Sequence, residues 1–326
     1  MRILIVLVLV AAAGWSAYWV VGSRMLRAAI DDGIAAMEES GATVETGGIR
    51  VTGFPNRFDT MIDAPRIARP GGMRWEAPFL QIFALSYRPN QIIVAFPEAQ
   101  TLETARGNVA IRADRARASA LFRTDAAGTL DHANLVVEGA RLAWEGREVA
   151  LRRILAATRV PAGAGAERQN IGVTLDDVDL PAGLLPGLTG EARLVDGVTM
   201  NAFLDLSAPL TRAALETGAV DLRRIEIERL DLDWGGVALD AAGALDVGAD
   251  GTLSGALEVT LTNWRRALEI VATAGLVTAA QRQMAEQGFA ALAAMSGRDD
   301  RLTTTLDLRD GRVWLGPVPL GPAPRL

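Results

Sequence analysis

The chain has 326 residues, half of them hydrophobic, which suffices for one large domain or two ordinary ones with a substantial core. It contains no cysteine and one histidine, so disulfides, thiolate chemistry and cysteine-based zinc sites are excluded. The net charge is −6, and the 33 basic residues, all arginine, are interspersed with acids, so a generic nucleic-acid binder is excluded too.

The first element is an apolar run over residues 3–21 that carries no charge. A helix of this length covers roughly 28 Å, about one hydrocarbon core. The run predicts a transmembrane anchor over residues 1–22, and aromatic rings near its far end suit the headgroup layer. The residues expected to contact lipid are Ile3, Leu9, Trp15, Tyr18, Trp19 and Val21. The alternative is a cleaved signal peptide, with the small residues 11–13 before the cut.

Charge leaves the orientation of this segment open, because Arg2 precedes it and Arg24 and Arg27 follow it. The bulk of the chain must lie on the far side of the run from the short leader. We expect a single-pass inner-membrane protein with that bulk in the periplasm.

The next segment, residues 23–40, is predicted to be a connecting helix that continues from the anchor. Its apolar side chains recur at spacings of three and four, from Leu26 to Met37, and Gly41 is the expected stop.

The remaining residues, 41–326, are predicted to form a β-rich periplasmic domain, because apolar and polar residues alternate along them. A short helix capped by Thr211 and a helical insertion near 263–296 interrupt the strands. Asn263 is a candidate cap for the insertion, and Gly275 is expected to divide it into two helices. The fold class is therefore mainly β: a large curved antiparallel sheet or meander with few helices, preceded by one N-terminal transmembrane helix.

Three Asp-Gly pairs predict turns between strands, at 196–197, 250–251 and 310–311. The apolar parity changes at Arg229, which predicts a bulge. The alternation also predicts one apolar face, whose candidate residues are Leu230, Leu232, Trp234, Leu257, Val259 and Leu261.

A sequence motif stands at Gly53-Phe54-Pro55-Asn56-Arg57. Gly53 permits unusual φ and Pro55 fixes φ, so the motif bends or ends a strand. Arg57 could hold a carboxylate, or alternatively a lipid phosphate.

With residues 75–78, 85–90 and 310–322, this motif resembles a family of alphaproteobacterial envelope proteins known as domain of unknown function 2125. The layout is also similar to proteins of the AsmA type, which have one membrane helix and a strand-rich periplasmic body. Larger AsmA relatives are implicated in phospholipid movement, so this second resemblance implies a lipid-related role. Neither resemblance implies catalytic residues.

Catalytic signals are weak in this chain. His132 lies in a polar stretch that we interpret as a turn, and the pairs 176–177 and 299–300 are acidic residues of a kind common in turns. We therefore predict no enzyme, no catalytic or metal-binding residue and no cofactor.

Two functions fit these observations. The first is lipid or another apolar ligand bound in a groove of the sheet, because one apolar face of a large sheet needs a cover. The alternative is a structural or assembly protein of the envelope that contacts an unidentified protein partner through its sheet edges. Membrane lipids are the expected partners, and nucleic acid is not.

Overall fold

The computed structural model describes residues 1–184, 189–275, 277–296, 299–316 and 318–325. Within these residues the chain divides into two compact units. Unit 1 comprises residues 1–136 and 211–219, and unit 2 comprises residues 137–210 and 220–326. The described residues are mainly strand, in antiparallel pairs, and one long apolar helix precedes them, so the predicted fold class is confirmed.

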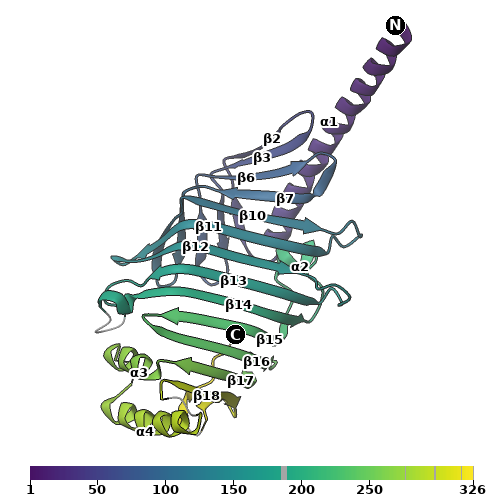
Figure 1. Cartoon of the computed structure of the whole chain (residues 1–326). Helices are drawn as coiled ribbons and strands as arrows, with labels where there is room; N and C mark the ends of the chain where they lie inside the picture. Colours follow the sequence, from purple (N-terminus) through teal and green to yellow (C-terminus); the bar gives the residue numbers. More distant parts are fainter. Residues whose placement is uncertain (185–188, 276, 297–298, 317, 326) are drawn as a thin grey trace. The chain divides into compact units, whose positions relative to one another are not determined.

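Helix α1 (Arg2–Glu39) joins the predicted anchor and the predicted connecting helix into one continuous element. It is long and apolar enough to cross a membrane, as a spanning helix or a signal sequence would be. The helix ends where Gly41 adopts a φ of +90°, so the predicted stop is confirmed. In Figure 1 its N-terminal half projects beyond the strands of unit 1.

Unit 1 holds two sets of paired strands, which we call its first wall and its second wall. The first wall has the order β2-β3-β6-β7-β10, and the second has β1-β4-β5-β8-β9. The strands are β1 (Thr43–Glu45), β2 (Gly48–Thr52), β3 (Arg57–Asp63), β4 (Arg66–Arg69), β5 (Met73–Glu76), β6 (Phe79–Leu85), β7 (Arg88–Phe96), β8 (Ala99–Thr104), β9 (Gly107–Arg112) and β10 (Arg115–Phe122).

The two walls are halves of one sheet that bends sharply along a line. The chain passes from one wall to the other between consecutive strands, such as β3 and β4. At each such passage a break of two residues separates the two strands and the chain bends. The breaks contain Pro65, Pro78 and Pro97, which fix φ and donate no backbone hydrogen bond. The ladder nevertheless continues across the bend, because Ala64 N–H donates to the Pro78 carbonyl at 2.9 Å and Ala77 N–H to the Pro65 carbonyl at 3.1 Å.

Unit 2 is an antiparallel meander in which each strand from β12 to β20 pairs with the next. Figure 1 shows β13 to β18 side by side in chain order. The preceding strand, β11 (Leu130–Trp144), contributes residues to both units. The strands of the meander are β12 (Arg147–Arg159), β13 (Arg168–Asp179), β14 (Leu194–Leu206), β15 (Leu222–Trp234), β16 (Val237–Val247), β17 (Leu253–Thr262), β18 (Arg301–Arg309), β19 (Arg312–Leu315) and β20 (Val318–Pro322).

The predicted bulge at Arg229 is confirmed. Between Ile227 and Leu230, β15 advances three residues while its partner β16 advances two, from Gly243 to Ala241. The extra residue returns the apolar side chains after the bulge to the face used before it.

The Asp-Gly predictions have mixed outcomes. Asp310 and Gly311 have φ of +53° and +69° between β18 and β19, so that tight turn is confirmed. The prediction at Asp196-Gly197 was wrong, because both residues lie inside β14, where the register slips between Val195 and Gly197. The slip absorbs the pair as a strand irregularity, and the ladder to β13 and β15 continues on both sides of it.

Four shorter helical elements complete the fold: η1 (Gly190–Arg193), α2 (Arg212–Thr217), α3 (Trp264–Thr273) and α4 (Ala279–Ser296). Thr211 caps α2 as predicted, accepting from Ala214 N–H at 3.2 Å. Gly275 lies between α3 and α4, also as predicted. Asn263 stands at the cap position of α3, but its side chain donates to the Gly236 carbonyl instead of capping the helix.

Candidate functional site

The candidate site lies in unit 1, where helix α1 meets two loops of the first wall. We call these loops the collar: residues 53–57, which join β2 to β3 and include the first residue of β3, and residues 86–87, between β6 and β7. Trp15 Nε1–H donates to the Pro55 carbonyl at 3.0 Å, and Trp19 Nε1–H donates to the Arg57 carbonyl at 2.8 Å. The Tyr18 hydroxyl donates to the carbonyl of Ser86 at 2.6 Å. Three side chains from one helix therefore fasten two separate loops.

Aromatic packing accompanies these hydrogen bonds. The Trp19 ring meets Phe54 edge-on, with centroids 5.5 Å apart, and lies 5.9 Å from the ring of buried Phe58. Gly22 lets the helix approach, because a Cβ there would stand 2.8 Å from Phe58 Cζ. The helix is thus packed against the wall as well as hydrogen-bonded to it.

Gly53 begins the collar in a conformation that few other residues adopt. Its φ is +100°, and a Cβ there would lie 2.8 Å from the Arg57 carbonyl oxygen. That carbonyl is the one that Trp19 binds. The Arg57 guanidinium pairs with the Asp59 carboxylate at 2.7 Å, which is the carboxylate contact that the sequence suggested. The motif therefore holds a bend whose carbonyls face the helix.

A shallow, open pocket of about 230 Å³ lies beside the collar, between α1 and β2. Ile49 and Val51 form its apolar side, and Ser23, Arg24 and Arg27 form its polar side. Arg27 is already engaged, donating to the Ile49 carbonyl at 2.6 Å and to Asp31 at 3.0 Å. Arg24 is exposed, and among the residues that the structure describes its guanidinium has no hydrogen-bond or ion-pair partner.

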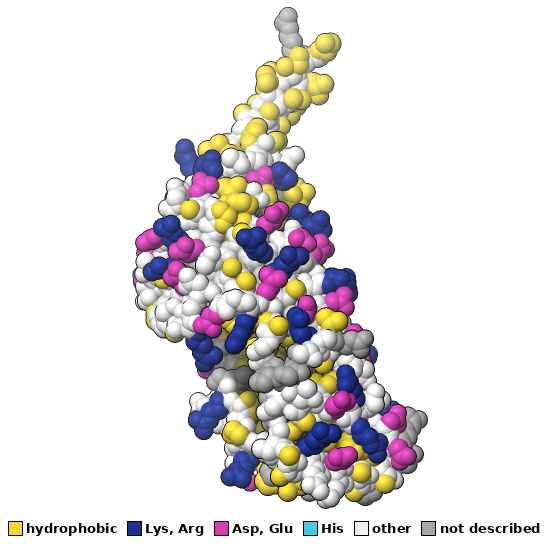
Figure 2. Space-filling model, turned by 90° about the vertical axis from the view of Figure 1, so that its left-hand side faces the viewer, with side chains coloured by type: hydrophobic (Ala, Val, Ile, Leu, Met, Phe, Trp, Pro, Cys, Tyr) yellow, Lys and Arg dark blue, Asp and Glu magenta, His cyan; other side chains and the backbone are white. Residues whose placement is uncertain are grey.

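The predicted anchor residues fall into two groups. Ile3, Leu9 and Val21 are 80%, 62% and 55% exposed, as side chains that contact lipid would be. Figure 2 shows hydrophobic side chains around the projecting part of α1, and charged side chains where it meets the body of unit 1. The aromatic residues of the anchor instead bind the collar. Sequence reasoning missed this contact, although three hydrogen-bond donors within five residues of an apolar helix were its signal.

The predicted apolar residues of unit 2 share one face of the sheet. In the register, Leu230 is aligned through Ala241 with Val259, and Leu232 through Leu239 with Leu261. Leu257 and Val259 are buried at 6% and 7% exposure in a cluster that also includes Ala202, Ile227, Leu245 and Leu308. Their packing stabilises unit 2, and a ligand role for them stays a prediction.

Helix α3 covers the end of this face. Trp234 and Leu261 pack against the cluster of Val237, Ile270 and Ala274, and the Trp234 indole N–H donates to the Ala192 carbonyl at 2.8 Å. Trp264, fully buried, contacts Phe289 of α4 edge-on at 5.9 Å. The helical insertion therefore closes one end of the apolar face of unit 2.

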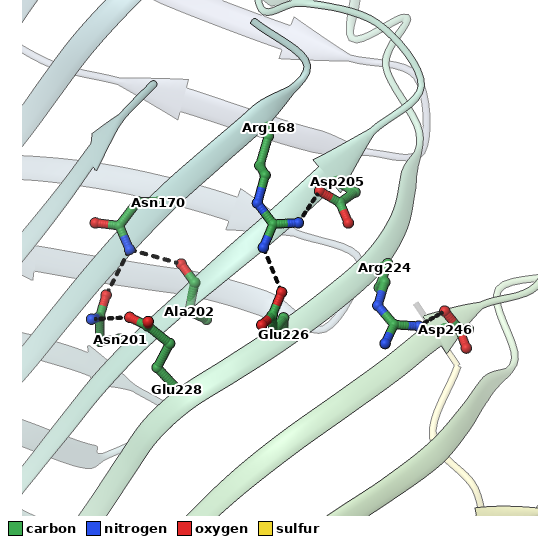
Figure 3. A network of polar contacts seen from close by, with 9 residues as sticks. All are labelled: Arg168, Asn170, Asn201, Ala202, Asp205, Arg224, Glu226, Glu228 and Asp246. Atoms are coloured by element: carbon green, nitrogen blue, oxygen red, sulfur yellow. Dashed lines mark hydrogen bonds and ion pairs between the residues drawn. The ribbon is translucent and has the colours of Figure 1, made fainter. Parts of the chain in front are cut away.

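The opposite face of unit 2 is held by polar pairs between neighbouring strands (Figure 3). Arg168 of β13 reaches Asp205 of β14 at 2.7 Å and also pairs with Glu226 of β15. Asn201 of β14 accepts from Asn170 and donates to Glu228. These contacts join β13, β14 and β15 and support the sheet.

His132 and the pair 176–177, which were considered for acid–base chemistry, are tied into local contacts. His132 lies at the start of β11, so its prediction as a turn residue was wrong. The strand begins at Leu130, where the turn closes through Arg123 N–H to the Thr129 carbonyl. A hydrogen bond from His132, aided by Arg123, lowers the pKa of Asp131. Asp177 pairs with Arg152, and Asp176 with Arg153 at 2.7 Å.

Within the described ranges, no group of three or more His, Asp or Glu side chains could hold a metal ion.

Comparison with known proteins gives one match. Residues 19–324 match a family described as "Uncharacterized protein conserved in bacteria" (DUF2125). No curated protein and no solved structure matches the chain. The family match begins at Trp19 and includes the whole collar, and it confirms the resemblance seen in the sequence. The chain therefore belongs to this conserved bacterial family.

Proposed function

We propose that the protein is a non-catalytic, single-pass component of the bacterial inner membrane that binds a lipid, or a similar apolar ligand with an anionic group, on its periplasmic side. Helix α1 is the anchor, and the pocket between α1 and β2 is where the ligand first contacts the strand-rich part of the protein.

The pocket is the observation that carries the proposal. Its apolar side suits an acyl chain, and Arg24 beside it, which has no partner among the described residues, suits a phosphate. The apolar run ends at Val21, so Arg24 follows it by three residues, about 4.5 Å along a helix. A phosphate of the anchoring leaflet lies at that level of an inserted helix.

The apolar side of the pocket continues into unit 1. Ile49 is aligned with Ile62 of β3, which is aligned with Leu80 of β6. Val51 begins a parallel row that passes Thr60 and reaches Ile82 and then Val94 of β7. At about 230 Å³ the pocket is smaller than typical ligand pockets of 300–1,000 Å³, so it can hold only part of a lipid. The rest of the ligand would lie in the bilayer or along these rows.

Photo-crosslinking in the intact chain tests the proposal, because neighbouring residues of β2 face opposite ways. A photoreactive amino acid at Ile49 lies on the pocket side, and the same group at Arg50, whose side chain is 67% exposed, lies on the outer face. We expect phospholipid adducts from position 49, fewer from position 50, and a further loss from position 49 when Arg24→Glu is added. Equal lipid adducts at both positions would refute a specific site. A protein adduct at position 49 without lipid would favour the assembly role instead.

The periplasmic placement has its own test, because the chain has no native cysteine. Ala105 is exposed in the turn between β8 and β9, so Ala105→Cys provides a single thiol on the body. We expect a membrane-impermeant maleimide to label it in intact spheroplasts. Labelling only after lysis would place the body in the cytoplasm.

A further inference from the structure

We propose that the tip of the collar itself inserts into the leaflet from which α1 emerges, with Phe54, Pro55 and Tyr87 entering the boundary between headgroups and acyl chains. This inference rests on the anchoring of α1 proposed above. It adds a second membrane contact, made by the β-rich body.

Helix geometry places the collar at this depth. The part of α1 before the first collar contact, residues 3–14, is about 18 Å long, and a hydrocarbon core is about 30 Å thick. The apolar run reaches roughly 28 Å only if it includes residues 15–21. Trp15 and Trp19 lie in that last stretch and are hydrogen-bonded to Pro55 and Arg57, so the loop carrying these carbonyls must share their depth.

The alternative is that the helix slides outward until the collar clears the bilayer. Residues 3–14 alone would then span it, leaving a deficit of about 12 Å. The cost of hydrophobic mismatch grows with each missing Å, so a deficit of this size disfavours the outward position. Insertion of a few collar atoms avoids that cost if their polar groups are satisfied.

The backbone beside the tip of the collar meets this requirement. Apolar surroundings penalise each unpaired carbonyl or N–H group. The carbonyls of Pro55, Arg57 and Ser86 accept from α1, and Pro55 has no N–H group. Arg57 N–H donates to the Gly53 carbonyl and Ser86 N–H to the Asn56 carbonyl, both at 2.9 Å. These contacts pair the Pro55 carbonyl at the tip and backbone groups beside it at Gly53, Asn56, Arg57 and Ser86.

The side chains of the tip fit the same boundary. Phe54 and Tyr87 are 55% and 59% exposed although they are large and apolar. Arg57, with a side chain 59% exposed, ends the first loop, and exposed Arg88 directly follows the second. Exposed aromatic rings beside arginines are typical of protein segments at a lipid interface.

Fluorescence from single-cysteine variants of the full chain in phospholipid nanodiscs tests this contact. An environment-sensitive fluorophore is attached to Phe54→Cys or, in a second variant, Tyr87→Cys. Ala105→Cys is the aqueous control because it lies in another exposed turn of unit 1. Leu7→Cys, in the apolar run, is the membrane control. Lipids with a nitroxide near the headgroup serve as quenchers.

We expect blue-shifted emission and strong quenching at positions 54 and 87, and neither at position 105. If the fluorophores at 54 and 87 behave like the one at 105 while position 7 is quenched, the collar lies outside the bilayer and the inference is wrong, although the anchor stands. If position 7 is also unquenched, both the anchor and the inference are wrong.

Discussion

Trp19 is the collar residue whose replacement separates hydrogen bonding from packing. Trp19→Phe removes the indole N–H bonded to the Arg57 carbonyl at 2.8 Å but keeps an aromatic ring near Phe54 and Phe58. Trp19→Ala removes the hydrogen bond and both ring contacts. The two variants should therefore weaken the attachment of α1 to the collar by different amounts.

The magnitudes follow from these contacts. Loss of one hydrogen bond costs about 1 kcal/mol, and each aromatic pair contributes about 1 kcal/mol beyond its buried area. We expect about 1 kcal/mol for Trp19→Phe and about 3 kcal/mol for Trp19→Ala. At 1.4 kcal/mol per factor of ten, local opening should become about fivefold and roughly 100-fold more frequent.

Hydrogen exchange of the full chain in detergent micelles measures this opening in the peptide covering residues 53–60, which includes the amide of Arg57 bonded to Gly53. Trp75→Phe is the matched control, because it deletes an indole hydrogen bond of 2.9 Å to Gln100 in the second wall. It should leave this peptide unchanged. Equal exchange in wild type and Trp19→Ala, or an equal effect of Trp75→Phe, would refute the docking role of Trp19.

Three further predictions concern local contacts. Thr211→Ala should lower the free energy of unfolding by about 1 kcal/mol through loss of the α2 cap, and urea denaturation that shows no change would contradict it. Arg168→Gln should destabilise unit 2 by about 1 kcal/mol, less in 1 M NaCl; a loss independent of salt would argue against ion pairing. Hydrogen bonds from Thr252 lower the pKa of Asp250. Their contribution is therefore present above the ordinary pKa of aspartate and lost as pH falls through the lowered value, so wild type and Asp250→Asn should converge in stability at acid pH.

Periodicity in the sequence revealed most of the regular structure. Alternation of apolar and polar residues predicts the strands of the meander. The change at Arg229 from odd to even apolar positions locates the bulge. Both signals depend only on which side of a strand a residue faces. Turn chemistry was less informative. Asp196-Gly197 has the composition of a tight turn, yet pairing with strands on both sides keeps it extended.

The bend of unit 1 and the collar are tertiary features that local patterns indicated only weakly. Pro65, Pro78 and Pro97 recur among alternating residues, which is a signal for interrupted strands, but nothing local shows that the interruptions line up across the sheet. The Gly53 motif was recognisable as a bend. Its partners Trp15 and Trp19 lie about 40 residues earlier. Nothing in the sequence suggested a protein contact of their rings, because a position in the headgroup layer already accounted for them.

The three hydrogen bonds of the collar also have a mechanical consequence. They join the helix to two loops of the same sheet, so α1 and the first wall of unit 1 turn as a single body. A helix in a bilayer adjusts its tilt to the thickness of the hydrocarbon core. With α1 anchored as proposed, a thinner membrane would make the helix lean further, and the wall attached to it would swing through the same angle. The collar would then convert bilayer thickness into the direction in which the strands of unit 1 point.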